Sequence, residues 1–305
     1  LMADPDLPNK VAEGRFDDLV AYGGWSTDDH HPGGMRWRGQ PTIFHPAPSP
    51  FGIPYRSLYS RNVKNLLFAG RNISATHAAM SSTRVMATCA ILGQAIGTAA
   101  AIAVRHRLLP GGVYQEKVGE LKQTLMEDDC YLPWNIREIP ALTKSAQLTA
   151  SEGDPEPLRN GIDRPIGDVD NGWTGRIGSW IQYTFNDIPV RRDSQSTKRR
   201  DSQSTKQKVR ELRFIFDSDL NRRTPNVPCN YPIHAEPVSV PQTMTRSFRI
   251  EALDKNGEWK AIAQENNNYQ RLVRIKTDIE TSAIRFIPLM TWGLESVHLF
   301  AWDVR

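Results

Sequence analysis

Short segments in which apolar and polar residues alternate fill the second half of the chain. They cover residues 180–185, 212–216, 248–252, 283–287 and 297–302. A period of two places successive side chains on opposite faces, which is typical of strands with one buried face. Asp254-Lys255-Asn256-Gly257 supplies a turn signal among these segments. The pattern predicts an antiparallel β-sandwich from about Leu142 to the end of the chain.

The first half of the chain shows a different pattern. Residues 65–70, Asn-Leu-Leu-Phe-Ala-Gly, form a short apolar run that ends at Gly70 and predicts a buried parallel strand. Residues 88–104 are almost continuously Ala, Ile, Leu and Gly, and we expect Leu92 to Gly97 to open an Ala-rich helix. Apolar residues at helical spacing predict a further helix over residues 115–128. This half is therefore of the α/β class.

The apolar stretch over residues 87–104 has a second interpretation as a transmembrane helix, with Gly93 and Gly97 on one small-residue face. The stretch is rich in Ala and Gly rather than Leu, and Gln94 falls in its middle. These features favour a buried core helix, and we expect no transmembrane segment. The prolines at 133 and 140 mark the change of pattern, which predicts domains over residues 1–141 and 142–305.

Charge is concentrated in one short segment. Residues 191–213 contain nine Lys or Arg and three Asp or Glu, whereas the net charge of the whole chain is +4. Within it, the octapeptide RRDSQSTK occurs twice over residues 191–206, and the lack of apolar side chains in this repeat predicts a disordered loop between two strands. A basic binding arm is the alternative. Because the rest of the chain carries a slight negative charge, we expect no nucleic-acid partner.

Candidate metal ligands are sparse. Cys89, Cys130 and Cys229 lie far apart and have no CxxC spacing, which gives no support for a zinc or iron–sulfur site or for a disulfide framework. Residues 28–31, Asp-Asp-His-His, are ligand types, but adjacent side chains seldom converge on one ion. A solvated loop is the expectation for them, and we predict no metal.

Two features predict a nucleotide cofactor. Ligands of open α/β sheets bind beyond the carboxyl ends of the strands, where Gly70, Arg71 and Asn72 would lie if residues 65–70 form such a strand. A helix that starts near Gly93 would present free N–H groups and its positive end to an electron-rich acceptor. A strand that ends at glycine, followed by a helix that starts at glycine, is by itself a weak signal for a nucleotide cofactor site.

A longer motif carries a family resemblance. The run NLLFAGRNISATHAAMSSTRVMATCAILGQAIGTAAA contains an Ala-Gly-Arg signature at residues 69–71, Ser-x-x-His at 74–77, Arg-Val-Met-x-Thr-Cys at 84–89 and Leu-Gly-Gln-Ala at 92–95. It resembles the C-terminal flavin motif of the FAD-dependent oxidoreductases with a glutathione-reductase-like fold. The resemblance implies an α/β flavin-domain fragment, the end of a Rossmann-like FAD fold, with FAD as cofactor.

The resemblance also implies residue roles. Gly70, Arg71 and Asn72 would contact the ribityl or pyrophosphate part of FAD, and Gly93, Gln94 and Ala95 would face the pyrimidine edge of the flavin. His77 and Arg84 would lie near the isoalloxazine as catalytic candidates, for substrate contact or proton transfer. The alternative is that His77 is a satisfied core histidine and Arg84 a structural ion-pair partner. The resembling family also has a segment similar to residues 23–32 in its substrate region.

The family also uses an N-terminal GxGxxG loop, and no such motif occurs in this sequence. We therefore expect the chain to be a fragment that holds the flavin-side half of the cofactor site. The compartment stays open, with a periplasmic or secreted location expected if a preceding segment carries a signal peptide.

The second half is similar to the discoidin or coagulation-factor type C family, an all-β, jelly-roll-like, galactose-binding-like sandwich. The similarity rests on Ile162-Asp163, on residues 180–183, on residues 248–251 with Gly257-Glu258-Trp259, and on the closing strand. Members often bind carbohydrates or lipids, and a purely structural appendage is an equal alternative.

The sequence as a whole predicts a fragment of an FAD-dependent oxidoreductase, which passes a hydride from a small-molecule substrate to flavin. A carbohydrate-related compound is one candidate for this substrate. The alternative function is a non-catalytic carbohydrate- or surface-binding protein that uses the sandwich.

Overall fold

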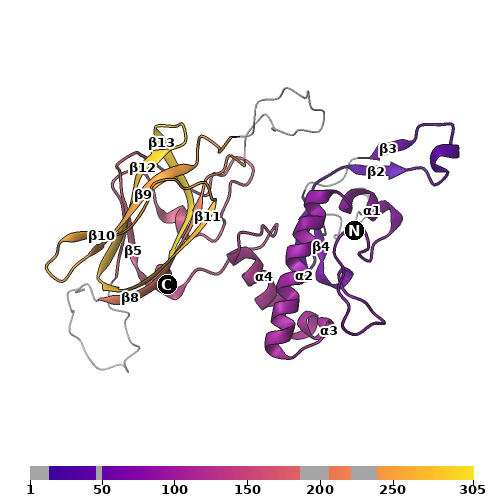
Figure 1. Cartoon of the computed structure of the whole chain (residues 1–305), viewed down its shortest axis with the longest axis horizontal. Helices are drawn as coiled ribbons and strands as arrows, with labels where there is room; N and C mark the ends of the chain where they lie inside the picture. The colour runs from indigo at the N-terminus through magenta and orange to yellow at the C-terminus, as the bar shows by residue number, and fades with distance from the viewer. Residues whose placement is uncertain (1–13, 46–49, 186–205, 221–238) are drawn as a thin grey trace. The chain divides into compact units, whose positions relative to one another are not determined.

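The computed structural model describes residues 14–45, 50–185, 206–220 and 239–305 (Figure 1). The chain divides into two compact units, residues 1–137 and 138–305. Cys229 and all of the tandem octapeptide except Lys206 lie outside the described residues.

The N-terminal unit is built on two small antiparallel two-stranded sheets, against which helices pack. Strand β1 (Leu19–Gly23) pairs with β4 (Phe51–Pro54), and strand β2 (Thr27–His30) pairs with β3 (Thr42–His45). Gly52 is required where β4 passes the segment before β1, because a Cβ there would lie 2.1 Å from the carbonyl oxygen of Gly14. Helices α1 (His77–Thr83), α2 (Met86–His106), α3 (Pro110–Gly112) and α4 (Val118–Glu127) follow, with a π-helical segment, η3 (Val113–Lys117), before α4. Two 3-10 turns, η1 (Gly34–Arg36) and η2 (Tyr55–Ser57), complete the unit.

Helix α2 provides one side of this unit's core. Leu92, Ala95, Ala99 and Ile102 repeat at helical spacing and are buried, and the helix packs against β1 and α4 (Figure 1). Arg107 ends it in the left-handed conformation, and the N–H of Leu108 donates to the carbonyl oxygen of Ala103. The predicted helix over residues 115–128 is confirmed by α4.

Helix α2 is long and apolar enough to cross a membrane, judged by length and composition, and 33% of its most apolar window is buried. One such helix is weak evidence for a span, because core helices of globular proteins meet the same criterion.

The expected parallel strand over residues 65–70 is wrong. Leu67 forms an isolated antiparallel bridge with Tyr59, and the N–H of Phe68 donates to the carbonyl oxygen of Leu58. Leu67, Phe68 and Ala69 pack against the core as a folded-back turn, whereas Leu66 is 40% exposed. All strand pairings among the described residues are antiparallel, so no parallel neighbour is present there to bury both faces of such a strand.

The expected helix start near Gly93 is also wrong. Helix α2 begins at Met86 after an N-cap at Val85, whose side chain accepts no capping hydrogen bond. Gly93 therefore lies about 10 Å along the helix axis from its start, at about 1.5 Å per residue. The free N–H groups of the first turn belong to the segment after Val85, and not to residues 93–95.

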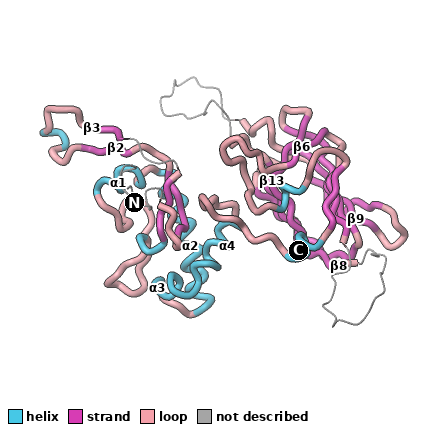
Figure 2. Tube along the Cα trace, turned by 180° about the vertical axis from the view of Figure 1, so that it is seen from behind, coloured by secondary structure: helices cyan, strands magenta, loops and turns pink. Residues whose placement is uncertain are grey.

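The C-terminal unit is the predicted all-β sandwich, which the structure confirms (Figure 2). One sheet has the order β10 (Trp259–Glu265), β9 (Thr245–Leu253), β12 (Ala283–Thr291), β7 (Ile181–Thr184) and β5 (Gln147–Ala150). The other has the order β11 (Leu272–Thr281), β8 (Gln207–Phe216), β13 (Ser296–Val304) and β6 (Trp173–Arg176). Helix α5 (Ala141–Ser145) and the 3-10 turn η4 (Glu156–Arg159) precede the first long strands.

Alternating inward side chains fill this sandwich with aromatic rings. Phe214 on β8 lies 5.7 Å from Trp302 and 5.4 Å from Phe286, centroid to centroid. Trp302 is completely buried, and Tyr183 donates its hydroxyl hydrogen to the Trp302 carbonyl oxygen. The ring cluster joins the inner faces of the two sheets into one core.

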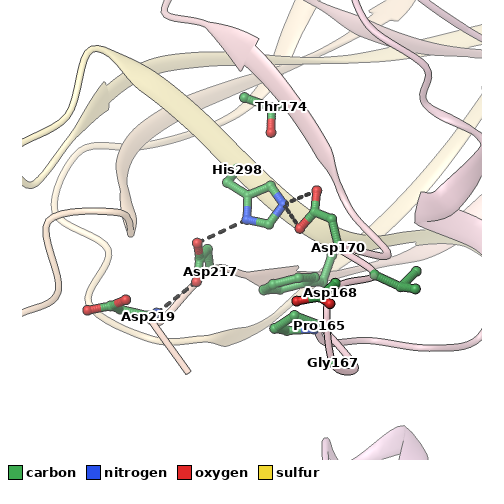
Figure 3. A pocket seen from close by; sticks show the side chains of 10 residues that line it. Pro165, Gly167, Asp168, Asp170, Thr174, Asp217, Asp219 and His298 are labelled. Carbon is green, nitrogen blue, oxygen red and sulfur yellow. Dashed lines mark hydrogen bonds and ion pairs between the residues drawn. The ribbon is translucent and has the colours of Figure 1, made fainter. Parts of the chain in front are cut away.

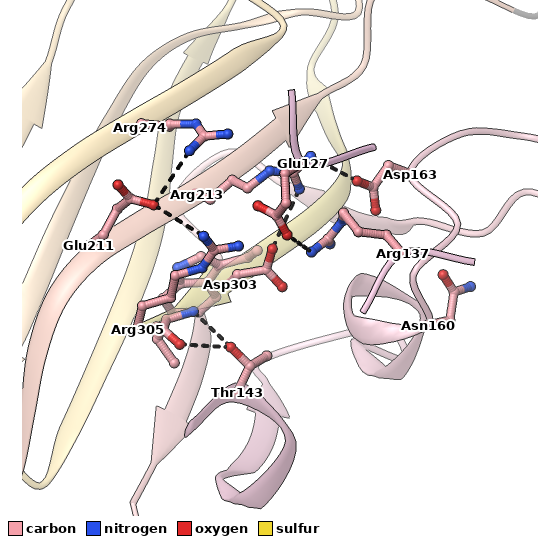
Figure 4. Close-up of polar contacts among 12 residues, drawn as sticks. Glu127, Arg137, Thr143, Asn160, Asp163, Glu211, Arg213, Arg274, Asp303 and Arg305 are labelled. Atoms are coloured by element: carbon pink, nitrogen blue, oxygen red, sulfur yellow. Dashed lines mark hydrogen bonds and ion pairs between the residues drawn. The ribbon is translucent and has the colours of Figure 1, made fainter. Parts of the chain in front are cut away.

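A buried guanidinium is the main polar exception. Arg213 on β8 has no exposed side-chain surface, and its guanidinium lies 3.0 Å from Asp163 and 3.4 Å from Asp303 (Figure 4). Asp303 on β13 is also fully buried, while Asp163 is 11% exposed. The pairing joins the loop before β6 to the two central strands of the four-stranded sheet.

Replacement of Arg213 tests this contact. Arg213→Ala should lower the free energy of unfolding by about 3–5 kcal/mol, because it leaves two carboxylates without their buried cation. Urea unfolding followed by tryptophan fluorescence measures the change. Lys208→Ala, which removes an ion pair to the exposed Asp278, is the matched control and should change stability little. Equal effects of the two variants would contradict a structural role for the buried pair.

Candidate functional site

The two residues predicted as catalytic lie together at the β2–β3 hairpin. His77 is the first residue of α1, where Thr76 caps the helix by accepting a hydrogen bond from the N–H of Ala79. Arg84 follows the last turn of the same helix, and β2 packs against it. The hydroxyl of Ser82 donates to the carbonyl oxygen of Trp25 at 2.5 Å and ties α1 to the start of the hairpin.

His77 forms a pair with Asp29. Its Nε2 lies 2.9 Å from Asp29 Oδ1, and the side chains are 60% and 35% exposed. Since a carboxylate only accepts hydrogen bonds, Nε2 carries the hydrogen and Nδ1 of a neutral His77 is left with its lone pair. The arrangement orients the imidazole and leaves Nδ1 as a base.

Arg84 binds the same hairpin through Asp28 and His30. One of its terminal nitrogens donates to the carbonyl oxygen of Asp28 at 2.9 Å and to Nδ1 of His30 at 2.6 Å. Because a guanidinium only donates hydrogen bonds, His30 Nδ1 accepts one from Arg84 and carries no hydrogen in this arrangement. Arg84 also lies 3.5 Å from the Asp28 carboxylate. The site therefore combines an oriented His–Asp pair with an arginine–histidine contact.

The partners of these residues were not predicted. Residues 28–31 were expected to form a solvated loop, but Asp28, Asp29 and His30 lie on strand β2 and contact α1. His31, beyond the strand, stacks on Trp37 with the rings 3.7 Å apart. Within the described part of the chain, no group of three or more His, Cys, Asp or Glu side chains is arranged to hold a metal ion.

The residues predicted to contact FAD are divided between two places. Gly70 has φ +101°, and a Cβ there would lie 3.9 Å from Cys89 Sγ, so the Gly70 turn adjoins the first turn of α2. Arg71 and Asn72 are exposed in that turn, and Gly93 and Gln94 are exposed along α2. Ala95 is completely buried in the core, so the structure does not present its side chain to a cofactor.

The exposed face of α2 carries small residues around Gly93 and Gly97. A Cβ built on Gly93 or Gly97 meets no atom within 4 Å, and these residues share a face with the exposed Ala90 and Ala101. Small side chains let a planar group approach the helix backbone closely. The α2 face and the Gly70 turn therefore leave room for a planar group beside Gly70, Arg71, Gly93 and Gln94.

A separate cavity of about 350 Å³ lies on the sandwich (Figure 3). Asp168 and Asp170 line it from the loop before β6, Asp217 lines it from the end of β8, and His298 lines it from β13. Thr174, Asp219 and Phe300 complete the wall with Pro165, Gly167 and Val169. The cavity is rich in hydrogen-bond acceptors and was not predicted from the sequence.

Comparison with known proteins bears out the predicted resemblance of the first half. Residues 2–125 match the family model described as FAD dependent oxidoreductase. This match covers the hairpin, α1, α2 and most of α4, and the N-terminal part is an α/β, FAD-like region. A search of curated proteins found no match.

The C-terminal part is similar to solved carbohydrate-binding modules. The family 32 module of Streptococcus pneumoniae EndoD is 14% identical, with 53% of this chain and 97% of that chain covered and a TM-score of 0.35. The family 32 module of C. perfringens NanJ, solved with galactose, is 9% identical over 53% and 95%, with a TM-score of 0.33. A Streptococcus pneumoniae fucose binding module is 14% identical over 53% and 92%, with a TM-score of 0.35.

The contacts of Arg84 lead to a test of the site's assembly. Arg84→Ala should raise the rate of chymotrypsin cleavage after Trp37, which is 48% exposed near the hairpin tip, by roughly tenfold. The reason is that the hairpin loses its charge-assisted bonds to α1. Mass spectrometry of timed digests identifies the cut. Arg71→Ala, in an exposed turn, is the control, and an unchanged rate in Arg84→Ala would show that the hairpin is held by other contacts.

Proposed function

We propose that the N-terminal unit supplies the flavin-side part of an FAD-dependent oxidoreductase site, in which a substrate passes a hydride to the flavin. The observation that carries the proposal is the family match over residues 2–125, which includes both the open face of α2 and the His77–Asp29 pair. Bound FAD would supply the hydride acceptor. The chain's own residues would bind the ring and move a proton.

His77 is the proposed proton acceptor. Hydride loss from an alcohol carbon leaves a hydroxyl proton that must be taken up as the carbonyl forms, and His77 Nδ1 holds an available lone pair. Asp29 keeps the Nε2 hydrogen engaged and stabilises the imidazolium that results. Arg84 and His30 act as positioning residues, because they hold the hairpin that carries Asp29 against α1.

The second candidate function is carbohydrate binding by the sandwich, favoured by its acceptor-rich cavity. Asp168, Asp217 and the hydroxyl of Thr174 have the chemistry to bond sugar hydroxyls. This function needs no flavin and is compatible with the first, since the groups involved belong to the C-terminal unit.

Flavin binding is tested by filling the open face of α2. Gly93→Trp should weaken the affinity for FAD at least about tenfold, since a large side chain would occupy the surface proposed for the ring. Gly119→Trp is the matched control, because Gly119 is exposed on α4 and a Cβ there also meets no atom within 4 Å. Titration of flavin fluorescence with each protein gives the affinities. Equal affinities, or no saturable binding by the unsubstituted chain, would count against the proposal.

Sugar binding is tested on a glycan array with the full chain. A positive spot should disappear in Asp168→Asn and persist in Asp278→Asn, which alters an exposed carboxylate on β11. Absence of any signal would remove the second candidate and leave the flavin proposal untouched.

A further inference from the structure

His298 is held between two carboxylates at the wall of the sandwich cavity (Figure 3). Its Nδ1 lies 2.9 Å from Asp217 Oδ2, and its Nε2 lies 3.0 Å from Asp170 Oδ1. The side chains of His298 and Asp217 are 17% and 14% exposed, whereas that of Asp170 is 59% exposed. Asp217 therefore belongs to the body of the sheet, and Asp170 belongs to the surface loop.

This geometry favours a charged imidazole. A neutral imidazole donates from one nitrogen and presents a lone pair at the other, and a lone pair that faces a carboxylate oxygen at about 3 Å is repelled. Only the imidazolium donates on both sides. Burial lowers the pKa of His298, but the bonds to Asp217 and Asp170 outweigh it, so that the pKa is raised above the ordinary value.

Other charged groups around His298 do not reverse this preference. Asp168 lines the cavity from the loop, and Asp219 lines it beyond β8, where its N–H donates to Asp217 Oδ1 at 2.7 Å. On an adjoining segment, the guanidinium of Arg271 lies 5.3 Å from the Phe300 ring, which contacts His298 edge-on. Thr174 on β6 adds a neutral hydroxyl.

The loop is attached at its two ends. Its start is fixed by Asp163, which pairs with the buried Arg213. Its tip is a tight turn in which Ile166 and Val169 exchange two backbone hydrogen bonds around Gly167, at φ +57°. At its end, Gly172 passes directly against His298, since a Cβ there would lie 2.4 Å from His298 Nε2. Asp170 thus attaches the loop to β13 through its side chain, while Asn171 accepts a hydrogen bond from Asn160 at 3.1 Å.

We propose that protonated His298 is a latch that holds the loop of residues 164–171 over the sandwich cavity, and that loss of its proton releases Asp170 and opens the cavity. The raised pKa of His298 sets the direction. The latch is fully formed below the ordinary histidine pKa and is lost as the pH rises through the raised pKa of the folded state. The inference is independent of the proposed flavin function and of any sugar.

NMR of the full chain with labelled nitrogen tests the latch. Below about pH 6.5, the ordinary histidine value, both ring nitrogens of His298 should show the shifts of an imidazolium, and the midpoint of its titration should lie above that value. Asp170→Asn should lower the midpoint. It should also increase the hydrogen-exchange rate of the Val169 amide, corrected for the intrinsic rate, roughly tenfold, because the loop opens more often.

The matched control is Asp168→Asn, which removes a carboxylate from the same loop and cavity without removing a bond to His298. It should leave the loop opening at the level of the unsubstituted chain. His298→Gln is a second variant and should make loop opening independent of pH. A neutral single tautomer of His298 below its ordinary pKa would overturn the latch, as would an Asp170→Asn protein with an unchanged midpoint and unchanged loop opening.

Discussion

The sandwich is organised around one buried cation. A guanidinium without exposed surface is costly unless carboxylates surround it, and Arg213 meets this condition by pairing with Asp303 on β13 and Asp163 in the loop before β6. The pair fixes where that loop leaves the sheet. Because the loop also carries Asp168 and Asp170, the cavity wall and the position of His298 relative to its partners depend on the Arg213 contacts.

The N-terminal unit depends on a different constraint, the one-sided burial of α2. Leu92, Ala95, Ala99 and Ile102 use one stripe of the helix for the core, which leaves the glycines at 93 and 97 on the opposite side. The helical periodicity that buries one side of α2 therefore leaves a face of small residues exposed on the other side. The Gly70 turn lies against the first turn of this helix, so the backbone of the turn lies next to small side chains of the helix.

The accuracy of the sequence-based predictions follows the range of the interactions involved. Strands such as 248–252 and 283–287 were predicted correctly because alternation is a local property of a half-buried strand. The run 65–70 was assigned wrongly because an apolar segment packs on a core equally well as a turn. The start of α2 was missed because Val85 gives no side-chain capping signal and helix-forming residues continue past it.

Contacts between distant segments were beyond such reasoning. His77 and Arg84 were proposed as site residues by family resemblance, but nothing local links His77 to Asp29 across 48 residues or Arg84 to His30 across 54. The same holds for His298 and Asp170, which are 128 residues apart. The type of each residue indicates what it can do, and only the fold indicates its partner.

The central claim is that the flavin-side surface consists of the Gly70 turn and the exposed face of α2. Hydrogen–deuterium exchange of the full chain with and without saturating FAD tests it most directly. The account predicts slower exchange in residues 70–72 and in residues 86–97, with no change in the sandwich strands. Protection confined to other segments, or none at all, would contradict it.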